Sequence, residues 1–175
     1  MISARFVIKR SSCELFSRLR KRVGFHSRQA DPKEEVAANS GALVEHINVI
    51  CMGVSGRDHR LLENVTKHQQ WNLYSAYTWA DCTHLINERR TCVLLLDRGA
   101  LGTDWKDAIR FVLRNARYCC ILLLSGTTQD TFCNDFIEYG GYEVLKTPLE
   151  DSDVIEAIRS ASAVWESFIE RAFGF

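Results

Sequence analysis

The sequence predicts an α/β protein built on a five-stranded parallel sheet, and two observations support this. Along residues 47–149, five short apolar runs alternate with stretches in which apolar residues recur at helical spacing. The runs are apolar at consecutive positions, as from Cys92 to Leu96, which is typical of strands buried on both faces. Strands of this kind, separated by helices, form a parallel sheet with helices on both sides.

Each element is predicted from its own pattern. Strands are expected at the apolar runs, which occupy residues 47–52, 71–77, 92–96, 119–124 and 142–146. Helices are expected where apolar residues are three or four positions apart, at residues 57–69, 78–89, 104–116, 129–139 and from 151 onward.

Local signals mark several element ends. Ser55 is a predicted N-cap of the first helix, and Thr78 and Asp81 have the spacing of a capping box at the start of the second. Gly140 ends the fourth helix, and Pro148 ends the last strand. These signals divide this part of the chain into five strand–helix units.

Five successive units with right-handed crossovers predict a flavodoxin-like, doubly wound sheet with the strand order 2-1-3-4-5. In such sheets the functional crevice lies at the carboxyl ends of strands 1 and 3. The loops that begin at Gly53, Asp97 and Ser125 all open onto that edge. Asp97 is a lone carboxylate at the end of a buried strand, and the glycines after it let the loop turn sharply over the site. It is therefore the first candidate functional residue.

Composition favours one globular domain with an extension. The chain has 175 residues, and 46% of them are hydrophobic. No apolar run approaches the roughly 18 residues that a membrane helix needs. The first ten residues are too highly charged for a signal peptide. We therefore expect a cytoplasmic protein.

The seven cysteines predict free thiols rather than disulfides or a zinc site. Their number is odd, and no two are spaced as a C-x-x-C pair. Cys51, Cys92, Cys119 and Cys120 lie in the apolar runs, where buried thiols behave as small apolar residues.

Residues 1–46 form a predicted N-terminal extension that is basic in its first part. Residues 1–30 carry eight basic residues against Glu14 alone, which gives 8 − 1 = +7, and the rest of the chain is −7 because the total is zero. Such an arm either contacts nucleic acid or an anionic membrane, or is a solvated tail or the result of a start codon assigned too far upstream.

The last predicted helix is longer than the fold requires. Its apolar residues recur at 4-3-4-3-4 spacing, namely Val154, Ile158, Ala161, Trp165, Phe168 and Ala172. We expect its first half to cover the sheet. The extension at residues 166–175 either packs on the basic arm or forms a homodimer.

With these elements in place, residues 47–165 resemble the receiver domain of bacterial response regulators, the CheY-like domain. The resemblance rests on the five-fold strand–helix order, on Asp97 and Ser125 at two strand ends, and on the stretch Gly140–Leu149. The segment Asp97–Trp105 is similar to the D-R-D-L-P-x-x-x-W variant of a divergent branch of stand-alone receivers. We therefore expect no helix-turn-helix or catalytic output domain outside the receiver-like residues.

The resemblance implies a site for aspartyl phosphorylation by a partner histidine kinase. Asp97 falls on the phosphoacceptor, and Ser125 falls on the hydroxyl that binds a phosphoryl oxygen. The family's magnesium-binding acidic pair falls at Gly53 and Val54, neither of which is acidic, so Asp97 is left as a weak magnesium candidate.

The family's lysine position, directly before a proline that is commonly in a cis peptide, holds Thr147. Lys146 stands one residue early, and because successive strand residues face opposite sides, only a bulge would re-aim it. The alternative, purely structural roles are that Asp97 caps the following loop and that the Ser125 hydroxyl stabilises a turn.

We therefore expect a degenerate receiver of two-component phosphorelay signalling that binds a protein partner, either a histidine kinase or a downstream effector. The family's surface of fourth helix, fifth strand and fifth helix is the expected contact. No enzymatic activity beyond self-phosphorylation, and no cofactor beyond weakly held Mg²⁺, is expected. The alternatives are a functional receiver phosphorylated on Asp97, and a regulator tethered to nucleic acid or membrane by the basic arm.

Overall fold

The computed structural model describes residues 47–89, 91–115, 119–128 and 130–173, with side chains in the last helix through Ser167. The predicted extension at residues 1–46, with its basic arm, lies outside the described residues. The side chains of Phe168 and Ala172, on which the predicted dimer contact depends, also lie outside them.

All five predicted strands and all five predicted helices are present, with ends that differ by two residues at most. The strands are β1 (Asn48–Met52), β2 (Asn72–Ala76), β3 (Val93–Asp97), β4 (Cys120–Ser125) and β5 (Glu143–Lys146). The helices are α2 (Gly56–Gln69), α3 (Trp79–Arg89), α4 (Trp105–Asn115), α5 (Thr131–Glu138) and α6 (Asp151–Phe173). The sequence patterns did not predict the short 3-10 helix η1 (Arg98–Ala100).

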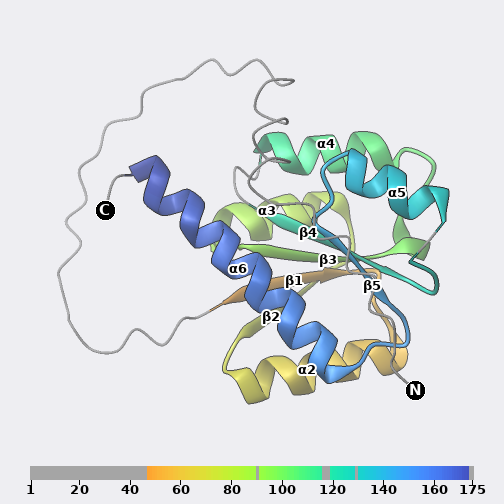
Figure 1. Ribbon diagram of the computed structural model, residues 1–175, viewed down its shortest axis with the longest axis horizontal. Coiled ribbons are helices and arrows are strands. Elements are labelled where there is room, and N and C mark those ends of the chain that lie inside the picture. Colours follow the sequence, from red (N-terminus) through yellow and green to blue (C-terminus); the bar gives the residue numbers. More distant parts are fainter. Residues whose placement is uncertain (1–46, 90, 116–118, 129, 174–175) are drawn as a thin grey trace, which may run out of the picture. The chain divides into compact units, whose positions relative to one another are not determined.

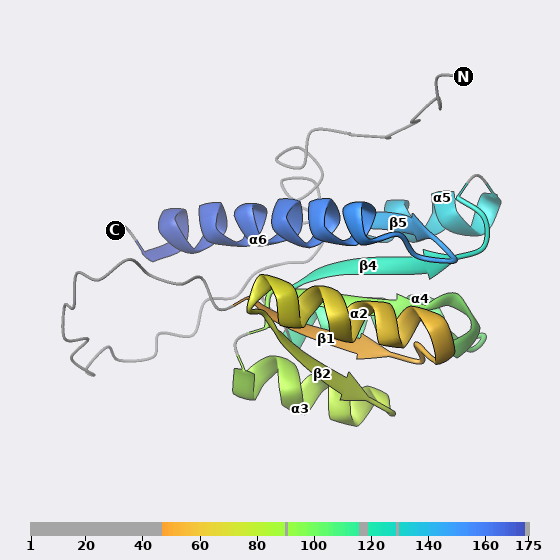
Figure 2. The ribbon, with the colours of Figure 1, turned by 90° about the horizontal axis from the view of Figure 1, so that it is seen from below.

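The sheet is parallel throughout and has the order β2-β1-β3-β4-β5, which confirms the predicted flavodoxin-like fold. Helices α2 and α6 lie on one face, and α3, α4 and α5 lie on the other (Figures 1 and 2). The central strands β3 and β4 carry the core, and Val93 to Leu96 and Ile121 to Leu124 are fully buried. Burying each such side chain stabilises the fold by about 1.5–3 kcal/mol. The apolar runs therefore explain why these strands lie at the centre of the sheet.

The cysteine prediction is confirmed for the six cysteines that the structure describes. Cys51, Cys92, Cys119 and Cys120 are buried and free, as are two further cysteines in the described helices. Burial raises the pKa of the Cys92 thiol to about 11 and that of Cys120 to about 12. These thiols therefore stay protonated at neutral pH and pack as apolar groups.

Two of the predicted caps differ in quality. Thr78 and Asp81 form the predicted capping box, since the Asp81 amide donates to Thr78 Oγ1 at 3.1 Å and the Thr78 amide donates to the Asp81 carboxylate at 2.9 Å. Ser55 occupies the N-cap of α2, but its hydroxyl makes no capping hydrogen bond. The predicted cis peptide between Thr147 and Pro148 is present.

The long helix α6 covers the sheet with its first half, as predicted. Val154, Ile158 and Ala161 are fully buried. Figure 2 shows that the helix then continues past the amino ends of the strands. Among the helices described, including this one, none combines the length and the apolar character needed to cross a membrane.

Hydrogen bonds at both ends of α2 join it to the last part of the chain. At its start, Asp58 Oδ1 accepts from the Leu149 amide at 3.0 Å. At its end, Gln69 Oε1 accepts from Arg159 of α6 at 2.7 Å.

Candidate functional site

The strand register brings Asp97 and Ser125 to the same edge of the sheet. Asp97 is the last residue of β3 and pairs with Leu124, so Ser125 lies one position farther along the neighbouring strand. Ser125 in turn pairs with Lys146 at the end of β5. The three residues singled out from the sequence therefore end three adjacent strands.

Asp97 caps the turn that follows it. Its Oδ1 accepts the Gly99 amide at 2.7 Å, which makes Asp97 the N-cap of η1. An aspartate in this position satisfies an amide at the start of a short helix. The carboxylate is half-buried and engaged by the backbone, as the alternative reading of Asp97 expects.

Gly53 closes the space on the β1 side of Asp97. A Cβ built on Gly53 would lie 2.2 Å from the Cβ of Ala100 and 3.4 Å from that of Asp97. The Gly53 φ of 75° also lies in the left-handed region that other residues adopt only with strain. The methyl group of Ala100 in η1 thus occupies the space that a side chain at Gly53 would need.

The residues at this edge do not fit a magnesium ion. Val54 supplies no oxygen ligand, and Asp58, the nearest carboxylate along the chain, is bonded to the Leu149 amide. Mg²⁺ needs a near-octahedral set of oxygens with one or two carboxylates beside the phosphate. Within the described ranges, no three His, Cys, Asp or Glu residues gather as a metal site.

Ser125 is 2% exposed, and its hydroxyl is surrounded by donors. The Arg98 guanidinium donates to its Oγ at 3.4 Å, the Thr127 amide donates at 3.3 Å, and the Cys133 thiol lies at 4.0 Å. The turn hydroxyl expected from the sequence is therefore present, and it also receives a cation.

Arg98 is the residue that organises this side of the edge. It forms an ion pair with Asp130, the N-cap of α5, and its guanidinium lies 4.4 Å from the centre of the Phe132 ring. The bond from Arg98, followed by those from Cys133, lowers the pKa of Asp130 to about 2. Asp130 is therefore ionised at neutral pH.

No bulge in β5 turns Lys146 toward Asp97. The strand β5 pairs with β4 without interruption from Glu143 to Lys146, and the Thr147 amide continues the ladder to the Ser125 carbonyl at 2.9 Å. Lys146 is exposed, and it forms no ion pair with any residue that the structure describes. The condition on which its candidate role depended is not met.

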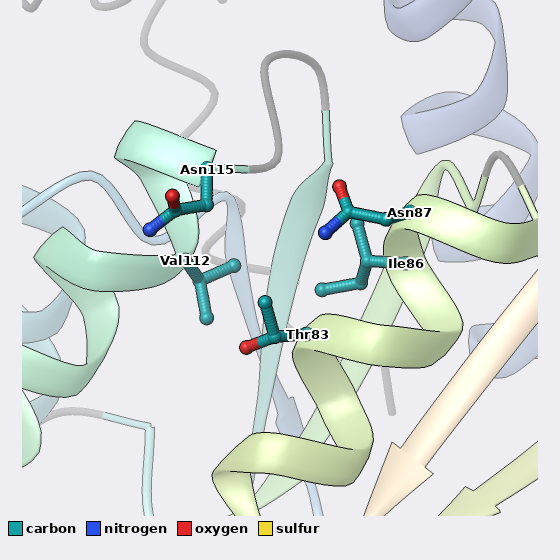
Figure 3. A pocket seen from close by; sticks show the side chains of 5 residues that line it. All are labelled: Thr83, Ile86, Asn87, Val112 and Asn115. Atoms are coloured by element: carbon teal, nitrogen blue, oxygen red, sulfur yellow. The ribbon is translucent and has the colours of Figure 1, made fainter.

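A shallow hollow lies elsewhere, between α3 and α4 (Figure 3). Its empty volume is about 140 Å³, and it is lined by Thr83, Ile86, Asn87, Val112 and Asn115. Asn87 and Asn115 come from the carboxyl-terminal ends of their helices, which lie at the opposite edge of the sheet from Asp97. The lining carries no charged group, so the hollow adds nothing to the candidate site.

Sequence reasoning missed Arg98 and Asp130. The predicted fourth helix began at Gln129, whereas α5 begins at Thr131 with Asp130 as its cap. An acidic residue directly before a helical pattern is an N-cap signal that would have found Asp130. No pattern predicts the direction of Arg98, because it depends on the 3-10 turn.

Comparison with known proteins places the fold. No protein-family model and no curated protein sequence matches this chain. Many solved structures do, and the signal receiver domain of an HD domain-containing protein from Pseudomonas fluorescens has a TM-score of 0.64 at 16% identity, over 77% of this chain and 99% of that one.

Two further similar structures are the receiver domain of NtrC4 from Aquifex aeolicus and the chemotaxis response regulator CheY4 of Vibrio cholerae. Their TM-scores are 0.58 and 0.57, at 18% and 12% identity. They cover 68% and 66% of this chain, each over 98% of its own length. The chain therefore has the fold of response regulator receiver domains, as the resemblance implied.

Proposed function

We propose that this chain, with its receiver fold, is a cytoplasmic signalling module of two-component phosphorelay transduction that binds a protein partner without being phosphorylated. The observation that carries the proposal is the contact between Gly53 and Ala100. Ala100 leaves no room for a side chain at Gly53, one of the two positions at which the resemblance expects an acidic residue, so the difference at Gly53 goes beyond a change of residue type.

The chemistry of phosphoryl transfer explains why this contact matters. A phosphoryl group moving from a donor to Asp97 would bond to one carboxylate oxygen as the donor's leaving group departs, and negative charge would spread over the transferred oxygens. Neutralising that charge is most of what the protein contributes. Here the metal-binding acids are absent, Lys146 is exposed, and Asp97 Oδ1 is held by Gly99.

Partner binding is supported by what remains intact. The helices and strands of the receiver fold are complete, including the surface formed by α5, β5 and α6, which corresponds to the family's fourth helix, fifth strand and fifth helix. We propose that this surface contacts the histidine kinase or downstream effector. The fold then serves as a recognition module whose shape does not depend on the site at Asp97.

The test is incubation of the full chain with Mg²⁺ and acetyl phosphate, followed by intact mass measurement. The matched control is Asp97→Asn, which keeps the size of the side chain and its acceptor for Gly99. We expect neither protein to gain the mass of a phosphoryl group at any donor concentration. An added phosphoryl mass on the wild type that is lost in the Asp97→Asn variant would overturn the proposal.

One observation favours the alternative of a functional phosphoacceptor. Asp97 and Ser125 end neighbouring strands, one register position apart, which is the arrangement that an acceptor and its hydroxyl require. In that case Arg98, which already donates to Ser125, is the cation available at the site. The mass measurement separates the two functions directly.

A further inference from the structure

Arg98 connects two loops at the carboxyl edge. It belongs to the turn after β3, and its side chain contacts Ser125, Asp130 and Phe132. All three partners lie between the end of β4 and the first turn of α5. A guanidinium suits this position, because its planar fork can pair with a carboxylate and a hydroxyl while its face packs on an aromatic ring.

Asp130 makes two bonds at once. One carboxylate oxygen pairs with Arg98, and the other accepts the Cys133 amide at 2.8 Å and so caps α5. The ion pair and the helix cap therefore share a single side chain. Charge-assisted bonds of this kind are stronger than neutral ones, and each bond orients the carboxylate for the other.

Helix α5 depends on such contacts because it is short. It has eight residues, and a helix of that length is marginal on its own. Farther along the helix, Asp135 pairs with Lys106 of α4 at 3.3 Å, and the same ammonium lies 4.5 Å from the centre of the Tyr139 ring. Two separate cations thus hold α5, with Arg98 at its start and Lys106 toward its end.

We infer that Arg98 is a positioning residue that latches the start of α5 to the turn after β3, and thereby fixes this part of the receiver fold without any group bound to Asp97. The hydroxyl that the resemblance assigns to a phosphoryl oxygen, that of Ser125, already receives the guanidinium. Any effect of this latch on partner binding rests on the proposed function, whereas its effect on the order of α5 does not.

The latch is tested by hydrogen–deuterium exchange of the full chain. The variants are Arg98→Met, which removes the cation at similar length, and Asp130→Asn, which removes the charge but keeps a good N-cap residue. Asp135→Asn is the matched control, because it removes the other ion pair of α5. The reporting amides are those of Thr127 and Cys133, which bond to Ser125 and Asp130.

We expect Arg98→Met and Asp130→Asn to speed exchange of these two amides about three- to tenfold relative to the amides of β3 and β4. The Asp135→Asn control should leave them within about 1.5-fold. A uniform acceleration over the whole domain, or no change in either variant, would contradict the latch. If Arg98→Met does not fold, Arg98→Lys replaces it and should give a smaller acceleration in the same direction.

The outcomes separate this inference from the proposed function. If acetyl phosphate labels Asp97 while the exchange behaves as expected, the proposed function fails and the latch stands. If labelling is absent and the exchange of Thr127 and Cys133 is unchanged in both variants, the latch fails and the proposed function stands.

Discussion

Between β1 and β3, the carboxyl edge of the sheet is closed by contact between Gly53 and Ala100, whereas between β3 and β4 it is closed by charged and polar groups. The first side has no room for a side chain at Gly53. The second side brings Arg98, Ser125 and Asp130 together. Two sides of one receiver-like edge can thus be closed by different means, by backbone-to-methyl packing at Gly53 on one side and by an ion pair and hydrogen bonds around Arg98 on the other.

Substitutions on the two sides of this edge should lower the free energy of unfolding by different amounts, and the largest loss is expected on the side where Gly53 packs against Ala100. We expect Gly53→Ala to lower the free energy of unfolding by about 2–4 kcal/mol, because the new methyl group meets Ala100 and the backbone is left-handed at this position. Urea unfolding measures the change.

The double variant Gly53→Ala with Ala100→Gly is the control for that substitution. It removes the overlapping methyl group, so roughly half of the lost stability should return, and the backbone strain should remain. A Gly53→Ala protein that unfolds within about 0.5 kcal/mol of the wild type would mean that η1 moves aside at little cost.

The polar side should give a smaller effect on stability. We expect Ser125→Ala to lower the free energy of unfolding by about 1 kcal/mol, because a buried acceptor for Arg98 and for the Thr127 amide is lost. Urea unfolding again measures it. An effect as large as that of Gly53→Ala would erase the distinction between the two sides.

A smaller change in stability is expected at acidic pH, where the Asp130 carboxylate becomes protonated. The pKa of Asp130 is about 2, below its ordinary value of about 3.9, so the carboxylate stabilises the fold above the ordinary value and this contribution is lost as the pH falls toward 2. The wild type should therefore be more stable than Asp130→Asn at pH 5, and the gap should close by pH 2. Urea midpoints for the two proteins, measured across that range, check it. A gap that does not change with pH would show that the charge of Asp130 is not what matters.

The smallest change in stability should come from substituting Lys146, which takes part neither in the packing at Gly53 nor in the contacts of Arg98. It is exposed at the end of β5 and forms no ion pair with the part of the chain that the structure describes. We expect Lys146→Ala to change the free energy of unfolding by less than about 0.5 kcal/mol. Like the wild type, the variant should gain no phosphoryl mass from acetyl phosphate. A fall in the free energy of unfolding of more than about 1 kcal/mol would show that Lys146 contributes to this edge.

The sequence could predict the fold more completely than the site, and particular residues show why. The runs around Leu94 and Leu122 are buried on both faces, so their pattern alone identifies central parallel strands and places Asp97 and Ser125 at one edge. That edge follows from periodicity, which is a property of the chain. What fills the edge depends on where side chains point within turns, and periodicity carries no information on that.

The contact between Gly53 and Ala100 and the reach of Arg98 are of this second kind. Both depend on η1, a three-residue 3-10 helix without a periodic signature. The sequence shows that Gly53 and Thr147 stand where the resemblance expects an acidic residue and a lysine. Only the structure shows that a side chain at Gly53 would also have no room. The same holds for Asp58, whose partner is a backbone amide far along the chain.

That long-range bond has a consequence for how the domain is made. Helix α2 bonds at one end to Leu149, 91 residues later, and at the other to Arg159, 90 residues after Gln69. At synthesis rates of about 5–20 residues per second, α2 waits on the order of 5–20 seconds before these partners exist. Contacts of such large sequence separation form late and slow folding. The hydrogen bonds at the two ends of α2, the first helix after β1, are therefore among the last of the domain to form.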